Sequence, residues 1–209
     1  MNDSTSLSNS ISLADDFGAQ RFAVVDTETT GLSTTDDLVL QIGVVVVRAD
    51  GTVEYEYSTY LRRLTWGFGH PGAYSVHGIT RRKLRSGAKP ADALAHLNES
   101  LRGALFTAHN AKFDLGFLAS DAARFGIDMQ LSPALCTLQL SRKLDPKRER
   151  SHKLGDVAQH YGIDRVQQHD ALADARLTAR CLPHLLRDLS ITSAADLRSH
   201  LIVDTVNAA

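Results

Sequence analysis

The residues with the clearest capacity for chemistry are two carboxylates at the end of an apolar run. Asp26 and Glu28 lie in the stretch FAVVDTETTG, directly after the apolar residues 22–25. An extended chain places every second side chain on the same face, so both carboxylates point the same way from the tip of a buried strand. Two anions beside a hydrophobic core cost roughly several kcal/mol unless a cation lies between them. The pair therefore indicates a site for a divalent metal ion.

Two aspartates further along the chain lie in segments with the apolar spacing of helices. Asp114 lies in AHNAKFDLGFL, and Asp174 lies in HDALADARLTA, where apolar residues repeat by three and four. Taken alone, each aspartate fits an ordinary solvated helix face. If they converge with Asp26 and Glu28, however, four carboxylates can hold two hard cations through oxygen, the ligand atom that Mg²⁺ and Mn²⁺ prefer.

Four ordered blocks of the sequence resemble those of the DEDD-type 3′-to-5′ exonucleases. The blocks are Asp26-x-Glu28 in DTETTG, VHGIT at residues 76–80, Asp114 in HNAKFD, and His169 with Asp174 in HDALAD. The resemblance runs from about residue 21 to about residue 188 and is to the histidine-bearing branch, which includes the proofreading epsilon subunit of bacterial DNA polymerase III. It implies a metal-dependent enzyme that hydrolyses terminal phosphodiesters and releases nucleoside 5′-monophosphates.

The resemblance also implies roles for the individual site residues. Two divalent cations, Mg²⁺ or Mn²⁺, would bind at the carboxylates. Asp26, Glu28 and Asp174 would hold the cation that binds the attacking water. Asp26 would bridge to the second cation, which Asp114 would support directly or through water. His169 would act as the general base, because an imidazole with a reference pKa of about 6.5 suits proton transfer near neutral pH.

His169 and Asp174 cannot both face the site from one helix. They are five positions apart, which puts their side chains out of phase on a helix with about 3.6 residues per turn. We therefore place His169 on the loop before the helix and expect Asp170 to be the helix N-cap rather than a metal ligand. Without the motif, His169 would fit an ordinary loop histidine near an N-cap.

A second group of residues is implied to meet the substrate. The backbone around Thr29 would meet the terminal 3′ hydroxyl, and Leu32 would wedge against the last base. His77, Asn110 and Phe113 would lie near the bound nucleotide. Each of these three also has a purely structural interpretation, since Phe113 fits a core position, Asn110 a helix cap and His77 a turn.

Strand and helix patterns alternate after an initial antiparallel hairpin. Residues 38–48 form a β-branched run, and Asp50-Gly51 before the alternating residues 53–58 predicts a hairpin whose second strand has one buried face. The remaining patterns predict strands at 104–108 and 134–138. Helices are predicted to begin at Pro90 and after the cap Asn110, and to span 138–144 and 154–161. A last helix contains Pro183, where it should kink or restart. This order predicts an α/β fold, and the resemblance implies a ribonuclease H-like mixed five-stranded sheet flanked by helices.

Length and composition fit one catalytic domain. The 209 residues, 43% of them hydrophobic, suffice for one core. We predict a flexible N-terminal tail at 1–20, the exonuclease domain at 21–188 and a short C-terminal tail at 189–209. The sequence shows no signal peptide and no stretch apolar enough for a membrane span, which predicts a cytoplasmic protein without membrane contact. Cys136 and Cys181 stand singly in apolar surroundings and are expected to be buried, reduced thiols.

The charge distribution limits the kind of nucleic-acid contact. A formal net charge of −1 argues against a protein that coats duplex DNA. Basic clusters at 81–85 and 142–153 are either solvated faces or phosphate contacts, and we hypothesise that the second forms a mobile rim that attracts phosphate. Trp66 and Phe68 could stack on bases or cover the sheet edge.

The leading prediction is an exodeoxyribonuclease of the proofreading or repair type that acts on the 3′ end of single-stranded or frayed DNA. A 3′-to-5′ exoribonuclease of the same fold is the first alternative, because no residue clearly reads the 2′ hydroxyl. A non-catalytic polymerase accessory module is the second, although the intact set of carboxylates with His169 argues against it. Only about twenty residues follow position 188, with no glutamine-led box of the clamp-binding kind, so we expect weak or no association with a DNA polymerase.

Overall fold

One mixed β-sheet forms the centre of the molecule in the computed structural model, which describes residues 13–14, 16–63, 72–164 and 169–203. Within these residues the sheet has six strands in the order β3-β2-β1-β4-β5-β6. β1, β2 and β3 form an antiparallel meander, β4 and β5 join β1 in parallel, and β6 returns antiparallel beside β5. The strands are β1 (Arg21–Thr29), β2 (Val39–Arg48), β3 (Val53–Tyr60), β4 (Leu105–Ala108), β5 (Ala134–Cys136) and β6 (Leu201–Ile202).

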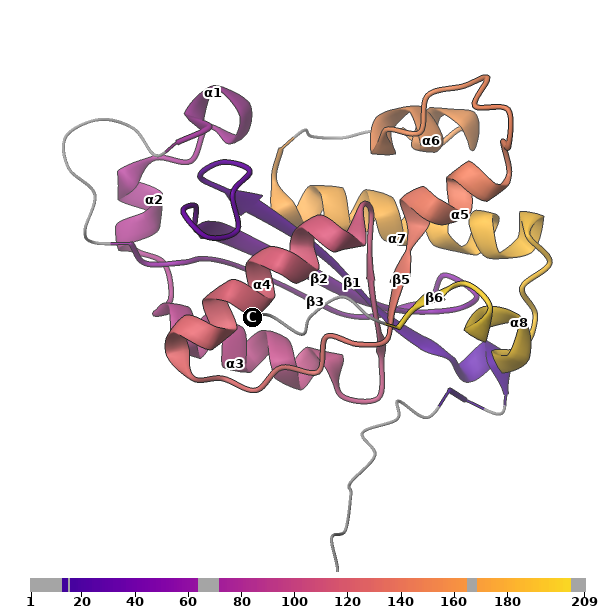
Figure 1. The fold of residues 1–209 in the computed structure, drawn as a ribbon, viewed down its shortest axis with the longest axis horizontal. Helices are drawn as coiled ribbons and strands as arrows, with labels where there is room; N and C mark the ends of the chain where they lie inside the picture. The colour runs from indigo at the N-terminus through magenta and orange to yellow at the C-terminus, as the bar shows by residue number, and fades with distance from the viewer. Residues whose placement is uncertain (1–12, 15, 64–71, 165–168, 204–209) are drawn as a thin grey trace, which may run out of the picture.

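Helices cover both faces of the sheet (Figure 1). α3 and α4 pack on the face to which Ala23 and Val25 of β1 point, whereas α7 packs on the face of Phe22 and Val24. β1 is thus buried on both faces, which explains its continuous apolar sequence. The helices are α1 (Tyr74–His77), α2 (Arg81–Arg85), α3 (Pro90–Leu101), α4 (Ala111–Phe125), α5 (Thr137–Lys143), α6 (Leu154–His160), α7 (Ala171–Asp188) and α8 (Ala194–Arg198), with a 3₁₀ turn at Phe17–Ala19.

The predicted hairpin is confirmed, but the predicted burial of its second strand is only partly right. β2 and β3 pair around a turn in which Gly51 has φ 92°, a conformation that glycine adopts without strain. β3 lies at the edge of the sheet, and Val53 is 51% exposed and Tyr55 39% exposed. Tyr57, in the second half of the strand, packs against the core. An alternating pattern therefore identified the strand but not its position at the edge.

The sheet has one strand more than the five predicted. β6 contains only two residues, too few for a periodic signal to stand out in the sequence. β6 and α8 both lie within residues 189–209, which we expected to be a tail, and Leu197 of α8 is fully buried. In addition, α7 is a single helix through Pro183 and does not restart there.

Both cysteines are free and buried, as predicted. Burial raises the pKa of Cys181 to about 12, so its thiol is poorly reactive. Trp66 and Phe68 lie outside the described residues. Among the helices that the structure describes, none combines the length and the apolar composition required of a membrane span.

Candidate active site

Two of the predicted acidic residues lie at the carboxyl end of the central strand β1. Asp26 and Glu28 continue the series of every second residue of β1 that begins with Phe22 and Val24. Phe22 and Val24 belong to the core cluster on the α7 face. Because alternate residues of a strand share a face, both carboxylates point toward the helix that carries Asp174. Both residues are half-buried.

The start of α7 brings two more predicted site residues, His169 and Asp174, to the carboxylates of β1. His169 lies on the loop before the helix, with its backbone in the left-handed region at φ 56°. Asp170 is the N-cap, and its Oδ1 accepts a hydrogen bond from the Ala173 N–H at 3.1 Å. Asp174 follows one turn later and is 8% exposed. The predicted loop position of His169 and the predicted cap at Asp170 are therefore confirmed.

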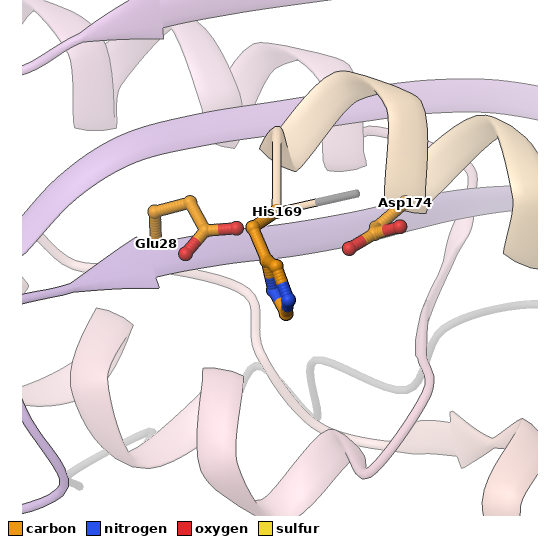
Figure 2. A group of neighbouring side chains, drawn as sticks. All are labelled: Glu28, His169 and Asp174. Carbon is orange, nitrogen blue, oxygen red and sulfur yellow. The ribbon is translucent and has the colours of Figure 1, made fainter. Parts of the chain in front are cut away.

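Three side chains are close enough to share one ion. Oxygen atoms of Glu28 and Asp174 and a ring nitrogen of His169 all lie within 4.8 Å of one another. Figure 2 shows the His169 ring between the two carboxylates, with Glu28 projecting from the strand and Asp174 from the helix. Carboxylate oxygen and neutral imidazole nitrogen are both metal ligands, so this arrangement can hold a divalent cation.

Asp114 approaches the site from the opposite face of the sheet. It lies in the first turn of α4, which begins three residues after β4 ends, and it is 3% exposed. Thr27 is next to Asp26 on β1, so its side chain points to the opposite face of the sheet. Its hydroxyl donates a hydrogen bond to Asp114 Oδ1 at 2.8 Å. The charge of Asp114 raises the pKa of Asp26, which places the two carboxylates within electrostatic range of each other.

The cluster holds more negative charge than its surroundings favour. Burial raises the pKa of Asp26 well above its ordinary value, and the charges of Asp114, Asp174 and Glu28 raise it further. Burial and then the charge of Asp174 raise the pKa of Glu28 to about 7, and burial raises the pKa of Asp114 to about 7. A divalent cation would offset these charges, so the donor set fits the oxygen-preferring metals predicted from the sequence.

The raised pKa values predict that protons compete with metal. Below pH 7 protons occupy Glu28 and Asp114, and a cation must displace them, whereas above pH 7 the carboxylates are already ionised. The affinity for Mn²⁺ should therefore rise between pH 6 and pH 8 by roughly tenfold or more, with protons released on binding. Calorimetric titrations in two buffers of different ionisation enthalpy measure both quantities. An affinity that falls or stays constant over this range would contradict the assignment, and Glu28→Gln should release fewer protons.

Sequence reasoning missed a glycine that sets the distance between α7 and the sheet. Gly43 of β2 pairs with Asp26, and a Cβ at this position would lie 2.3 Å from the backbone carbonyl carbon of Ala171. Only a residue without a side chain allows this approach of the first turn of α7. A lone glycine inside the β-branched run 38–48 was the sequence signal that could have indicated it.

We therefore expect Gly43→Ala to move the start of α7 away from the carboxylates of β1. The added methyl meets backbone atoms, which cannot rotate away, so the cost in stability should be about 1–3 kcal/mol. Activity should fall by at least about tenfold, because the metal-binding side chains no longer converge. Thermal unfolding and nucleotide release measure the two effects. Gly18→Ala is the matched control, since the atom nearest to its methyl is Oδ1 of the Asp16 side chain at 3.2 Å, and equal behaviour of the two variants would refute the explanation.

Two of the predicted substrate residues lie at the carboxyl end of the central strand and shortly after it: Thr29 is the last residue of β1, and Leu32 follows three positions later. Thr29 is buried, and its hydroxyl donates a hydrogen bond to the Gly31 carbonyl at 2.6 Å. Leu32 is 85% exposed. The chain therefore presents an exposed apolar side chain four positions after Glu28.

The other three predicted substrate residues have mixed outcomes. His77 is buried at the end of α1, where its Nδ1 accepts a hydrogen bond from the Ile79 N–H and its Nε2 hydrogen bonds with the Gly72 carbonyl. Burial and the nearby His169 lower its pKa. Asn110 is the N-cap residue of α4, as predicted, with φ 75°, but its side chain makes no cap hydrogen bond. Phe113 is half-buried and packs against Phe117, with ring centroids 4.8 Å apart.

Comparison with known proteins identifies the family. The model of a family described as Exonuclease (RNase_T) matches residues 23–182, most of the chain. The chain belongs to this exonuclease family. The resemblance deduced from the four sequence blocks is thereby confirmed, as is the mixed α/β fold.

Relatives of this exonuclease domain include much longer proteins. It is 32% identical over 169 residues to the PolC-type DNA polymerase III of Latilactobacillus sakei, and 29% identical over 189 residues to that of Oceanobacillus iheyensis. These matches cover 80% and 86% of the chain but only 11% and 12% of the two polymerases.

Solved structures of exonucleases share the fold. E. coli Exonuclease I in complex with a dT13 oligonucleotide superposes with a TM-score of 0.71 and 19% identity, covering 82% of this chain and 42% of that one. The nuclease domain of 3′hExo, a DEDDh family member bound to rAMP, superposes with a TM-score of 0.68 and 16% identity, covering 84% and 95%.

Proposed function

We propose that the protein is a divalent-metal-dependent exonuclease that removes nucleotides from the 3′ end of single-stranded or frayed DNA and releases nucleoside 5′-monophosphates. The observation that carries the proposal is that ligand atoms of Glu28, His169 and Asp174 lie within 4.8 Å of one another, beside the half-buried carboxylate of Asp26 and the buried carboxylate of Asp114. These residues come from a strand, a loop and two helices far apart in sequence. Membership of the exonuclease family supports the reaction type.

Asp26, Glu28, Asp114 and Asp174 are the residues that would hold two divalent cations, Mg²⁺ or Mn²⁺. Such ions would neutralise the charge of the phosphodiester and stabilise the entering and leaving oxygens of an in-line displacement. Thr27 keeps Asp114 oriented by donating a hydrogen bond from its hydroxyl to Asp114 Oδ1. The N-cap at Asp170 fixes the helix turn from which Asp174 projects.

His169 is proposed as the general base. Its ring lies between Glu28 and Asp174 (Figure 2). Because His169 lies on the loop before α7 and not within the helix, its imidazole can face an incoming water. A neutral imidazole accepts a proton near pH 7 far more readily than a carboxylate that is neutralised by a cation. The same geometry would also allow His169 to bind metal directly, and the two roles predict different results on mutation.

The terminal nucleotide is proposed to lie against Leu32 and the backbone of Thr29. Leu32 supplies an exposed apolar surface for the last base, while His77, Asn110 and Phe113 border the rest of the nucleotide. None of these residues selects clearly between deoxyribose and ribose. The similarity to PolC-type DNA polymerases supports DNA as the substrate of this protein. The structural similarity to a nuclease domain bound to rAMP supports a 3′-to-5′ exoribonuclease as the second candidate.

The basic segment 142–153 is proposed as a phosphate-contacting rim. His109 directly precedes Asn110, and its Nε2 hydrogen bonds with the His152 carbonyl at 2.9 Å. Asp145 accepts hydrogen bonds from the Glu149 and Arg150 N–H groups within the same segment. The bond from His109 ties the segment to the residues after β4, and the Asp145 bonds hold its internal turn, so we propose a fixed rim rather than the mobile one expected from the sequence.

The direct test follows the fate of a labelled 3′ end. With Mg²⁺ or Mn²⁺, a 3′-labelled single-stranded DNA should lose its label as a mononucleotide, and EDTA should stop the release. The same strand labelled at its 5′ end should shorten stepwise and retain its label. A matched RNA strand distinguishes the two candidate substrates. Release of internal fragments, or no release with either metal, would contradict the proposal. Co-purification of a stoichiometric DNA polymerase would overturn the expectation of weak or no polymerase association.

A further inference from the structure

A buried glutamine outside the acidic motifs contacts the start of α7. Gln41 of β2 is only 3% exposed. Its Nε2 donates hydrogen bonds to Asp170 Oδ2 at 2.9 Å and to the Ser58 hydroxyl at 3.2 Å, and its Oε1 accepts one from the Ala171 N–H at 3.4 Å. Nearly every polar group of this side chain is therefore used, and two of the three bonds go to the cap and first residue of α7.

The position of Gln41 in the sheet relates these bonds to the carboxylates. In the antiparallel ladder Gln41 pairs with Glu28, and Gly43 pairs with Asp26. Directly opposite residues of neighbouring strands point to the same face, so Gln41 lies on the face where α7 packs. β2 thus meets the first turn of the helix twice, through the bare backbone at Gly43 and through the amide at Gln41.

The amide is suited to this place because it donates and accepts at once. Asp170 is fixed from two sides, since Oδ1 receives the Ala173 N–H and Oδ2 receives the Gln41 amide. His169 immediately precedes Asp170 and holds a left-handed backbone, and Asp174 is one turn further on. A glutamate at position 41 could still accept from Ala171, but it would place a second anion against Asp170.

We propose that Gln41 is a positioning residue that fixes the start of α7, and with it His169 and Asp174, against the carboxylates of β1. The inference rests on the proposed function and adds to it a residue that touches neither metal nor substrate. Its role depends on complementary hydrogen bonding with Asp170, so exchanging the two functional groups should preserve it.

The test is a cycle of four proteins: wild type, Gln41→Glu, Asp170→Asn and the double variant. Gln41→Glu opposes two carboxylates, and Asp170→Asn opposes two amide donors, so each should lower kcat by roughly 10- to 100-fold with a smaller change in KM. Each should also weaken Mn²⁺ binding by about tenfold. In the double variant the amide introduced at position 170 can donate to the carboxylate introduced at position 41 and still cap the helix, so both quantities should return to within about threefold of wild type.

The outcomes separate this inference from the proposed function. Thermal unfolding of all four proteins reports the fraction folded, to which activity and Mn²⁺ affinity are normalised. Single variants that unfold earlier but keep kcat and Mn²⁺ affinity per folded molecule would overturn the inference, and so would a double variant no better than its parents. An inactive wild-type protein would refute the proposed function, and the Mn²⁺ affinities of the cycle would still decide the role of Gln41.

Discussion

Asp26→Ala and Asp174→Ala should each abolish nucleotide release, lowering kcat by more than about 10³-fold. Each variant removes an oxygen donor from a cluster whose charges are tolerated only with a cation present, so the loss should come from metal binding. Asp174 is one of the three residues whose ligand atoms lie within 4.8 Å of one another, and burial together with the charges of Asp114, Asp174 and Glu28 raises the pKa of Asp26. Steady-state kinetics and Mn²⁺ titration of the same samples measure the effect.

The stability of these variants provides an internal check. Burial and neighbouring charges disfavour the ionised form of Asp26, so Asp26→Asn should leave the melting temperature in EDTA unchanged or higher while activity is lost. Asp50→Asn is the matched control, because it removes a carboxylate from the β2–β3 turn, away from the cluster, and leaves Asn-Gly, which suits a hairpin. Full activity in Asp26→Asn would contradict the metal-binding role.

His169→Ala should lower kcat by on the order of 10²- to 10⁴-fold while Mn²⁺ affinity is retained. The loss arises because His169 supplies the imidazole of the group that it forms with Glu28 and Asp174. His169→Asn is a second variant that tolerates the left-handed backbone at φ 56° better than alanine, so it separates loss of the base from strain in the loop. Kinetics over pH 6 to 9 and Mn²⁺ titration measure the two effects.

The geometry makes this prediction a decisive one for the division of roles. A His169 nitrogen lies as close to Glu28 and Asp174 as a shared ligand would. If His169→Ala and His169→Asn both lose Mn²⁺ affinity as strongly as Asp174→Ala, the histidine is a metal ligand and the general base lies elsewhere. Unchanged affinity with the expected loss of kcat would support the base.

Features that depend on short stretches of sequence were predicted well. Apolar runs and helical spacing located β1, β2, α4 and α7, and Asp50-Gly51 located the hairpin. The phase difference between His169 and Asp174 correctly placed His169 on a loop, and Asp170 is the expected N-cap. These successes share one cause, because each rests on a local geometric rule that tertiary contacts do not overturn.

Features that depend on long-range contacts were missed. The exposure of Val53 follows from the place of β3 at the sheet edge, and β6 forms only because β5 is available for pairing. The roles of Gly43 and Gln41 depend on contacts with Ala171 and Asp170, roughly 130 positions away along the chain. Periodicity cannot reveal which strand the start of a helix will contact. The positions of Gly43 and Gln41 beside α7 could therefore not be predicted from motifs alone.

The central claim is that folding gathers distant acidic side chains into a site that divalent cations stabilise. Calorimetric titration of the protein with Mn²⁺ at pH 8 tests it most directly. The account predicts saturable uptake of about two ions, with binding weakened in both Asp26→Asn and Asp174→Asn and unchanged in Asp50→Asn. No detectable uptake, or uptake that all three variants share equally with the wild type, would contradict it.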